Sequence, residues 1–319
     1  MFIQISVFII SCIVLSWLSK SLIKTLVQIA RYLNLKEFVV GFFIMAFATS
    51  APNLFVDINA AMQGLPQMAF GDIVGGNLVD LTLVMSLAVL FSKRGISTKS
   101  NMVQSSAIFT GLIAILPLLL ILDGSLDRID GAVLLLAFFG YAIWIFSKND
   151  NFQKIYKHTK GEEGITTFWL VKNVAKLILL LSLLLASSFA IVDSAQVFAK
   201  ALGVPIALVG ILIVGLGNCF PEAYFSIISA RKGEGWMILG DLMGSVIVCA
   251  TLVLGIVALI SPFTITDFSP FLVARIFVLV AVVFYLFAIK SDKKITKKEA
   301  LLLLFTYIAF LITEVFLPH

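Results

Sequence analysis

The chain has 319 residues, of which 61% are hydrophobic and only 13% are charged, and its mean hydropathy is +1.09. Soluble domains carry roughly 25% charged residues, so this composition excludes a water-soluble fold. The net charge of +5 would suit an anionic partner. The positions of the basic residues instead indicate how the chain is oriented in a membrane, and we predict no nucleic-acid partner.

Ten apolar runs follow one another along the chain. A helix needs about 20 apolar residues to cross a bilayer, and the runs predict spanning helices at residues 2–19, 37–62, 67–92, 104–122, 130–147, 167–199, 205–230, 236–261, 270–289 and 299–317. We therefore expect an all-α integral membrane protein with ten transmembrane helices, surrounded by membrane lipid. A cleavable signal peptide is the alternative for residues 1–19, but no basic region precedes their apolar run and no clear small-residue cleavage site follows it.

The basic residues are distributed unevenly between the two sides that ten spans define. Of the 23 Lys and Arg residues, 20 fall on one side, and only Arg128, Lys200 and Arg275 fall on the other. Cytoplasmic loops are enriched in Lys and Arg, so we expect both chain termini to be extracellular. The polar stretch 148–166 is then a cytoplasmic linker between a first half, residues 1–147, and a second half, residues 167–319.

The two halves contain an internal repeat. Residues 41–90 align without gaps on residues 210–259 at a constant offset of 169. The most informative matches are Gly41 with Gly210, Pro52 with Pro221, Gly64 with Gly233, Gly71-Asp72 with Gly240-Asp241, and Gly75 with Gly244. Five spans separate the two copies, so we expect five-plus-five inverted-topology repeats with cores at 37–92 and 205–261, a common transporter design.

Each repeat carries a proline inside a predicted span. The chain reads Ala-Phe-Ala-Thr-Ser-Ala-Pro-Asn at 46–53 and Gly-Leu-Gly-Asn-Cys-Phe-Pro-Glu at 215–222. Proline removes a backbone donor and frees the carbonyl about one turn earlier. Both segments add oxygen-bearing side chains, which Na⁺ and Ca²⁺ prefer as ligands. A simple proline kink explains either segment alone, whereas two matched copies favour an ion site.

Carboxylates in the interior of the repeat spans are the second indication of an ion site, and they are Asp57, Asp72, Asp80, Glu222 and Asp241. An ionisable group inside a bilayer costs at least ~2.5–3.5 kcal/mol and is a functional hypothesis by default. The same spans contain no Lys or Arg, so these groups imply bound cations or protons. The sequence has no H-E-x-x-H motif and no convincing Ser/His pair, so we predict neither an enzymatic activity nor a cofactor.

The repeats resemble the cation/calcium exchanger superfamily, and the prokaryotic sodium/calcium exchangers in particular. The resemblance lies in the helix breaks at Pro52 and Pro221 and in the Gly-Asp-x-x-Gly step after each break. The family usually has Asn where this chain has Asp72 and Asp241. The resemblance implies five plus five helices around a central ion site, in a prokaryotic plasma membrane, with a single chain being sufficient.

The resemblance also implies a set of cation ligands. The side chains at ligand positions are Thr49, Ser50, Asn53, Asp80, Asn218, Glu222, Ser245 and Cys249, and the backbone carbonyls are those of Ala46 and Gly215. The family's two glutamates fall on Asn53 and Glu222, and its paired Asn and Asp fall on Asp80 and Cys249. The central carboxylates are therefore reduced to Asp80 and Glu222, whose charge balances one divalent ion, two monovalent ions or two protons.

The function that this ligand set implies is secondary antiport by alternating access, in which Ca²⁺ or another divalent cation exchanges for Na⁺ or H⁺. A cation channel and a non-transporting cation sensor are the alternative functions. Asp57, one helical turn from Asn53, either restores a third charge or is a wetted residue near the outer end. Cys249 is either a thiolate that selects a soft metal or a neutral thiol. Asp72 and Asp241 are further candidate ligands.

Overall fold

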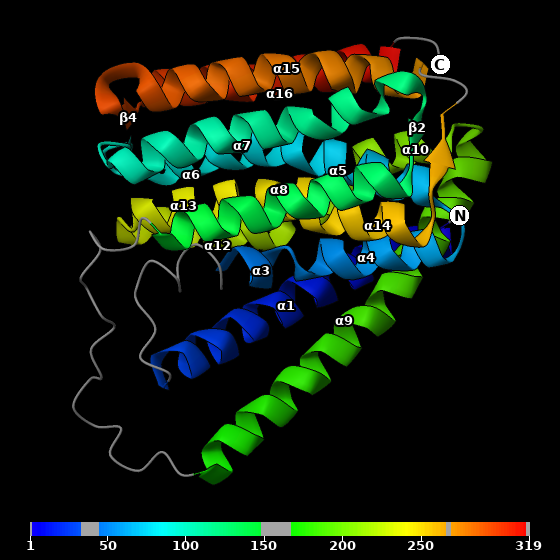
Figure 1. Cartoon of the computed structure of the whole chain (residues 1–319), viewed down its shortest axis with the longest axis horizontal. Coiled ribbons are helices and arrows are strands. Elements are labelled where there is room, and N and C mark those ends of the chain that lie inside the picture. The colour runs from blue at the N-terminus through cyan, green and yellow to red at the C-terminus, as the bar shows by residue number, and fades with distance from the viewer. Residues whose placement is uncertain (1, 33–44, 148–166, 266–268, 317–319) are drawn as a thin grey trace.

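The computed structural model describes residues 2–32, 45–147, 167–265 and 269–316, which are folded almost entirely into helices (Figure 1). The expected linker at 148–166 lies outside these residues. So do Gly41 and the first part, 37–44, of the second predicted span.

The first half contains α1 (Phe2–Tyr32), α3 (Met45–Thr49), α4 (Ala51–Met62), α5 (Pro66–Val79), η2 (Asp80–Val84), α6 (Met85–Phe91), β1 (Ile96–Ser97), α7 (Asn101–Leu120), η3 (Ile121–Asp123), β2 (Ser125–Leu126) and α8 (Arg128–Ser147). The second half contains α9 (Thr167–Leu202), α10 (Ile206–Val209), η5 (Gly210–Val214), α11 (Gly215–Asn218), α12 (Phe220–Lys232), α13 (Gly235–Ile247), η6 (Val248–Val253), α14 (Leu254–Ile260), β3 (Phe263–Thr264), α15 (Ser269–Lys290), η7 (Ser291–Lys293), β4 (Lys294–Ile295) and α16 (Lys297–Phe316). The segments η2, η5 and η6 are π-helical, and η3 and η7 are 3₁₀ turns.

Nine helical segments within the described residues are long and apolar enough to cross a membrane. They are Ile3–Leu26, Pro66–Phe91, Asn101–Asp123, Arg128–Ser147, Val171–Leu202, Ile206–Lys232, Gly235–Ile260, Phe271–Lys293 and Lys297–Phe316. They coincide with nine of the ten predicted spans. The remaining prediction, 37–62, corresponds over its described part to α3 and α4, which are separated at Ser50.

The first predicted span, 2–19, was too short, because α1 continues to Tyr32. Beyond the apolar run the helix becomes amphipathic. Leu22 and Thr25 are buried, whereas Lys20 and Lys24 are exposed. A hydrophobic run therefore marks where the helix can contact lipid, and the helix itself extends as long as one of its faces can pack.

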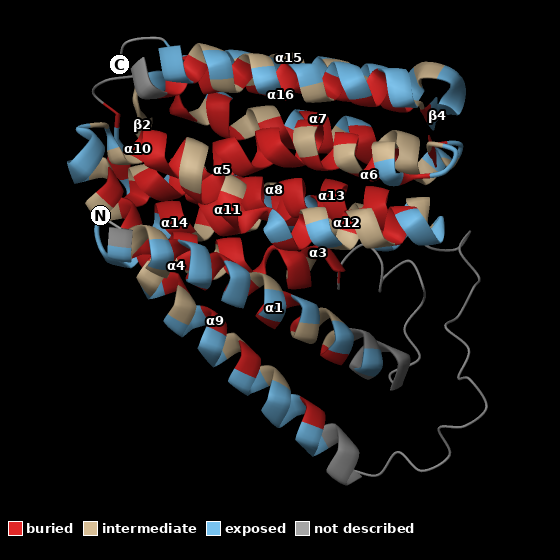
Figure 2. Cartoon of the chain, turned by 180° about the vertical axis from the view of Figure 1, so that it is seen from behind, coloured by how far each residue is buried: buried red, intermediate tan, exposed pale blue. Residues whose placement is uncertain are grey.

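The helices form a packed centre with two long helices at one side. In Figure 1, α1 and α9 slant across the edge of the molecule beyond α3 and α4. Figure 2 shows that buried residues concentrate on α5, α11 and α13. In an apolar stretch of 18 residues within Pro66–Phe91, 83% of the residues are buried, whereas in the corresponding stretch of Val171–Leu202 only 22% are buried. The polar residues of α5 and α13 are therefore shielded from lipid by the other helices.

Elements of the two halves begin at the same interval as the sequence repeat. α5 begins at Pro66 and α13 at Gly235, while α8 begins at Arg128 and α16 at Lys297, so 169 residues separate the members of each pair. The short strands connect the halves, because β1 pairs with β4 and β2 pairs with β3, both antiparallel. Each half contributes one strand to each two-stranded sheet.

Glycines allow α5 to approach the segment α10–η5 closely. A Cβ atom at Gly71 would lie 2.3 Å from the carbonyl oxygen of Ala207, and one at Gly75 would lie 2.2 Å from that of Ile211. A Cβ atom at Gly210 would lie 2.4 Å from the carbonyl oxygen of Met68. Small residues at such crossings let helix backbones touch, which holds α5 of the first half directly against the second half.

Candidate cation site

Two broken helices carry candidate ligands to the contact between the halves. α3 and α4 are separated at Ser50, and α11 and α12 are separated at Cys219. These two residues have almost the same backbone conformation, with φ and ψ of −79° and −1° at Ser50 and −80° and 2° at Cys219. Pro52 and Pro221 follow two residues later and have no backbone N–H to donate. The two breaks are therefore equivalent in geometry as well as in sequence position.

The helices α5 and α13 change to π-helix where further candidate ligands lie. η2 begins at Asp80, and Cys249 is the second residue of η6. The hydroxyls of Thr82 and Thr251 each donate a hydrogen bond to the carbonyl oxygen four residues earlier in the chain. Side chains that enter the backbone ladder in this way locally change a helix, and π-helical segments are frequent at functional sites.

Two hydrogen bonds cross between the halves and mirror each other. The Thr49 hydroxyl donates to Asp241 Oδ1 at 2.9 Å, and Asn218 Nδ2 donates to Asp72 Oδ2 at 2.6 Å. Thr49 and Asn218 are 169 residues apart in the sequence, and so are Asp72 and Asp241. Hydrogen bonds to a carboxylate are roughly twice as strong as neutral ones, so each broken helix is tied to the helix that faces it from the other half.

Ser245 lies between the two broken helices. The Ser50 hydroxyl donates to Ser245 Oγ at 2.9 Å, and the Ser245 hydroxyl donates to Glu222 Oε1 at 3.3 Å. Ser245 is also within hydrogen-bonding distance of the Asp80 carboxyl group. One hydroxyl therefore connects both broken helices and the start of η2.

Two further repeat-related pairs lie among the predicted ligands, and we call this cluster of predicted ligands the centre. Asn53 Nδ2 donates to Cys249 Sγ at 3.4 Å, which leaves the Asn53 amide oxygen without a partner. The equivalent residues of the opposite halves are Glu222 and Asp80, which are close enough to interact electrostatically. The first pair consists of an amide and a thiol, whereas the second consists of two carboxyl groups. The two halves therefore differ most in charge at these positions.

Several buried oxygens of the centre have no hydrogen-bond donor, namely Asn53 Oδ1, Asp80 Oδ1, Glu222 Oε2 and Asp241 Oδ2. Their side chains are at most 3% exposed. Among the described residues, each buried side chain of the five types Asp, Glu, His, Lys and Arg is acidic. Buried charge without a partner is strongly unfavourable, so the arrangement calls for cations or protons from outside the protein.

All eight predicted side-chain ligands are buried, and they gather where the broken helices meet η2, α13 and η6. The two predicted carbonyl ligands already accept backbone hydrogen bonds. Ser50 N donates to Ala46 O at 2.9 Å, and Cys219 N donates to Gly215 O at 3.3 Å. A carbonyl oxygen has two lone pairs, so Gly215 O retains one, whereas Ala46 O also lies 3.1 Å from the Thr49 hydroxyl.

The sequence leaves two roles open for Asp57 and two for Cys249, and the structure bears on both residues. Asp57 is fully buried, so its interpretation as a wetted residue is wrong. Its carboxyl group lies within hydrogen-bonding distance of that of Asp72. Within the described residues, no three His, Cys, Asp or Glu side chains are grouped so as to hold a metal ion. Cys249 therefore has no soft-metal cluster around it in that part of the chain.

Ser226 is a buried polar residue that was not predicted from the sequence. It lies 169 residues after Asp57, it is fully buried, and its hydroxyl has no hydrogen-bond partner. The offset of the repeat was the signal that identifies it, because Ser226 occupies in α12 the position that Asp57 occupies in α4.

A cavity of about 300 Å³ between α1, α12 and α13 was also not predicted. Lys20, Lys24 and Lys232 line one part of it, and Pro221 lines another. Pro221 directly precedes Glu222 in α12. Glu222 itself is fully buried and does not line the cavity.

Known proteins resemble this chain in sequence and in fold. The sodium/calcium exchanger MaX1 of Methanosarcina acetivorans is 22% identical over 325 residues, covering 91% of this chain and 92% of that protein. The uncharacterized membrane protein MJ0091 of Methanocaldococcus jannaschii is 28% identical over 218 residues, covering 68% and 69%. The structure of the sodium-calcium exchanger NCX_Mj soaked with Na⁺ and Sr²⁺ matches with a TM-score of 0.69 and 25% identity over 99% of each chain.

The family described as sodium/calcium exchanger protein matches residues 3–147 and 172–316. The match includes both halves and every predicted ligand, and it confirms the resemblance that the helix breaks indicated. This chain belongs to the sodium/calcium exchanger family of membrane transporters.

Proposed function

We propose that this exchanger moves Ca²⁺, or another divalent cation, in one direction and Na⁺ or H⁺ in the other, with the ions competing for one site at the contact of the broken helices. Asp80 and Glu222 supply the charged oxygens. The neutral ligands are Thr49, Ser50, Asn53, Asn218 and Ser245, with the carbonyls of Ala46 and Gly215. The donor-free oxygens of Asp80 and Glu222 are the observation that supports this function most directly.

Charge balance provides the coupling in this proposal. A divalent cation neutralises both Asp80 and Glu222. When it leaves, two buried negative charges remain, and buried charges are costly unless they are paired. Two monovalent ions then have to enter before the site can reorient through the apolar part of the protein.

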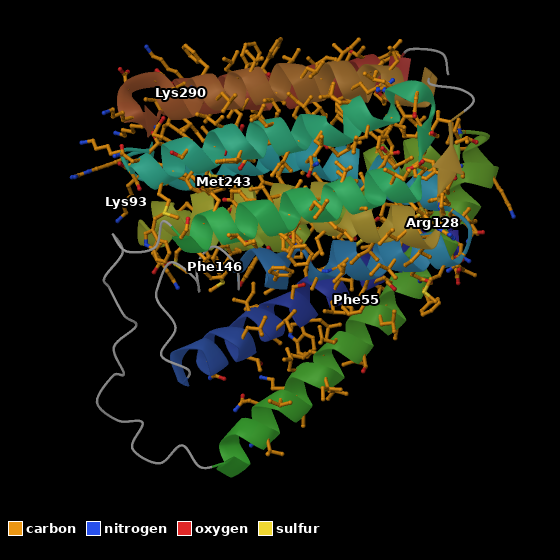
Figure 3. All side chains as sticks on the ribbon, viewed as in Figure 1. Phe55, Lys93, Arg128, Phe146, Met243 and Lys290 are labelled. Carbon is orange, nitrogen blue, oxygen red and sulfur yellow. The ribbon has the colours of Figure 1, made fainter. Side chains whose placement is uncertain are left out.

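We further propose that the ten predicted spans form two five-helix halves of opposite orientation. The mirrored bonds Thr49–Asp241 and Asn218–Asp72 support this architecture, as do the crossed strand pairs. Figure 3 shows Lys93 and Lys290 at one end of the helices and Arg128 at the other. The lysine end is then cytoplasmic and the chain termini are extracellular.

Alternating access finds support in two repeat-related helix pairs that are joined by side-chain hydrogen bonds. Between α4 and α9, Asn59 Nδ2 donates to Ser188 Oγ at 3.3 Å and Gln196 Nε2 donates to Gln63 Oε1 at 2.9 Å. Between α1 and α12, Lys20 Nζ donates to the Tyr224 hydroxyl at 2.8 Å, but the cavity of about 300 Å³ lies beside this bond. Side chains join both helix pairs, and a cavity lies beside the bond between α1 and α12, as an access path at that pair requires.

The test is uptake of ⁴⁵Ca²⁺ into vesicles that contain the purified protein. Vesicles loaded with Na⁺ and diluted into Na⁺-free buffer are compared with vesicles that have an outward H⁺ gradient and with vesicles that have no gradient. We expect uptake to require one of the two gradients. Uptake that is equal in all three conditions would indicate a channel, and absence of uptake with intact ⁴⁵Ca²⁺ binding would indicate a sensor.

A further inference from the structure

A second pair of buried carboxyl groups lies outside the centre formed by Asp80 and Glu222. Asp57 in α4 and Asp72 in α5 are within hydrogen-bonding distance of each other. Asp57 is fully buried, and Asp72 is 1% exposed. Like charges at such a distance repel unless something positive lies between them.

The oxygens of this pair are not satisfied by the protein. Both carboxyl oxygens of Asp57 and Oδ1 of Asp72 have no hydrogen-bond donor. Asn218, which is 1% exposed, donates from Nδ2 to Asp72 Oδ2 at 2.6 Å, and its own Oδ1 has no partner. An unpartnered amide oxygen beside two carboxyl groups adds no positive charge but offers a ligand. Four oxygens of this pocket, two from Asp57 and one each from Asp72 and Asn218, therefore accept no hydrogen bond.

This pocket is separate from the central pair along both helices that form it. Asp72 precedes Asp80 by eight residues of helix, a rise of about 12 Å at 1.5 Å per residue. Asp57 follows Asn53 by four residues, or about 6 Å. The pocket thus lies beyond the centre, toward the Met62 end of α4 and the Pro66 end of α5, which are the ends joined by the Gln63–Leu65 turn.

We propose that Asp57 and Asp72, together with Asn218, which this site shares with the centre, form a second cation site, which binds one Na⁺ ion in addition to the ions at the centre. Four protein oxygens fall short of the six to eight that Ca²⁺ takes. The Asn218 amide already stabilises the charge of Asp72, which leaves the charge of Asp57 for one monovalent ion. The proposal extends the exchange cycle described above and rests on it for the assignment of the centre to the exchanged divalent ion.

The site exists in one half only. The repeat-related positions are Ser226 and Asp241, so the equivalent pocket has one carboxyl group fewer. There, Asp241 Oδ1 accepts a hydrogen bond from Thr49. An extra Na⁺ ion is therefore expected on the α4–α5 side and not on the α12–α13 side, which makes the two directions of the transport cycle unequal.

The substitution Asp57→Ser tests the site, because Ser is the residue that the other half has at this position. We measure equilibrium binding of ²²Na⁺ and of ⁴⁵Ca²⁺ to the purified full chain by scintillation proximity. The variant is expected to bind one Na⁺ fewer per protein and to keep its ⁴⁵Ca²⁺ binding. Asp57→Asn, which preserves the side-chain shape, is expected to behave in the same way. Asp193→Asn removes an exposed carboxyl group and should change neither quantity.

Unchanged ²²Na⁺ binding in both Asp57 variants would overturn the proposal and would point to a shared proton between Asp57 and Asp72. Loss of ⁴⁵Ca²⁺ binding in variants that still elute as a single folded species would also overturn it, because the pair would then belong to the centre. A wild-type protein that binds no ⁴⁵Ca²⁺ would contradict the proposed exchange, whereas the ²²Na⁺ difference would still decide the second site.

Discussion

The Thr49 hydroxyl lies 2.9 Å from Asp241 Oδ1, and the equivalent bond from Asn218 to Asp72 repeats this contact with the halves exchanged. Each bond joins a broken helix of one half to the unbroken helix of the other. The proposed ion centre is therefore assembled at a contact that neither half contains alone. Its ligand geometry depends on how the halves are held together, which suits a site that is to open toward one side at a time.

Removing the donor of either mirrored bond is expected to destabilise the protein. Thr49→Val leaves Asp241 Oδ1 without its donor, and Asn218→Leu does the same to Asp72 Oδ2. Each loss is expected to lower the free energy of unfolding by about 1–3 kcal/mol. The measurement is the melting temperature of the purified variants. Thr306→Val is the control, because the Thr306 hydroxyl bonds only to the Leu302 carbonyl within its own helix, and a melting temperature as low as in the other two would contradict the prediction.

The contact of α5 with α10–η5 should tolerate no side chain at its glycines. Gly71→Ala and Gly75→Ala place a methyl group against the carbonyl oxygens of Ala207 and Ile211, and overpacking of this kind costs about 1–3 kcal/mol or more. We expect both variants to show a lower melting temperature and reduced ⁴⁵Ca²⁺ uptake. Gly140→Ala is the matched control, since a Cβ atom there would have no neighbour within 4 Å. Equal behaviour of all three variants would show that the close approach is not required.

The proposed orientation of the chain in the membrane can be tested with single-cysteine substitutions on its two sides. Arg128→Cys is expected to react with a membrane-impermeant maleimide in intact cells, whereas Lys93→Cys and Lys290→Cys should react only after permeabilisation. The native residues Cys12, Cys219 and Cys249 are buried and give a low background. Labelling of Lys93→Cys from outside would reverse the proposed topology.

The spans and the repeat could be predicted because the bilayer forces each crossing segment to be apolar and to satisfy its own backbone, as a helix does. The end of α1 could not, because the helix continues past the apolar run with Leu22 and Thr25 buried and Lys20 and Lys24 exposed. The strand pairs β1–β4 and β2–β3 were not predicted either. Strands of two residues have no hydrophobic period, and their partners lie far away in the sequence.

The burial of the candidate ligands where the broken helices meet could be predicted because proline and carboxylates are rare and costly in membrane spans, so their matched positions are informative. The contacts among these residues could not be predicted from the sequence. Whether Asp57 meets Asp72 or faces water depends on how α4 packs against α5, which the glycine contacts of α5 help to determine. The π-helical turns at Asp80 and Cys249 have no distinct residue signature, and they decide which way those side chains point.

The most direct test of the central claim is Na⁺-driven or H⁺-driven uptake of ⁴⁵Ca²⁺ by vesicles that contain Glu222→Gln or Asp80→Asn, compared with wild type and with Asp193→Asn. Each central substitution keeps the shape of the side chain but removes one of the two charges that hold the divalent ion. We expect both to lower uptake by at least about tenfold, which corresponds to 1.4 kcal/mol, while Asp193→Asn keeps the wild-type rate. Wild-type uptake in both Glu222→Gln and Asp80→Asn would contradict the assignment of these two carboxylates to the transport site.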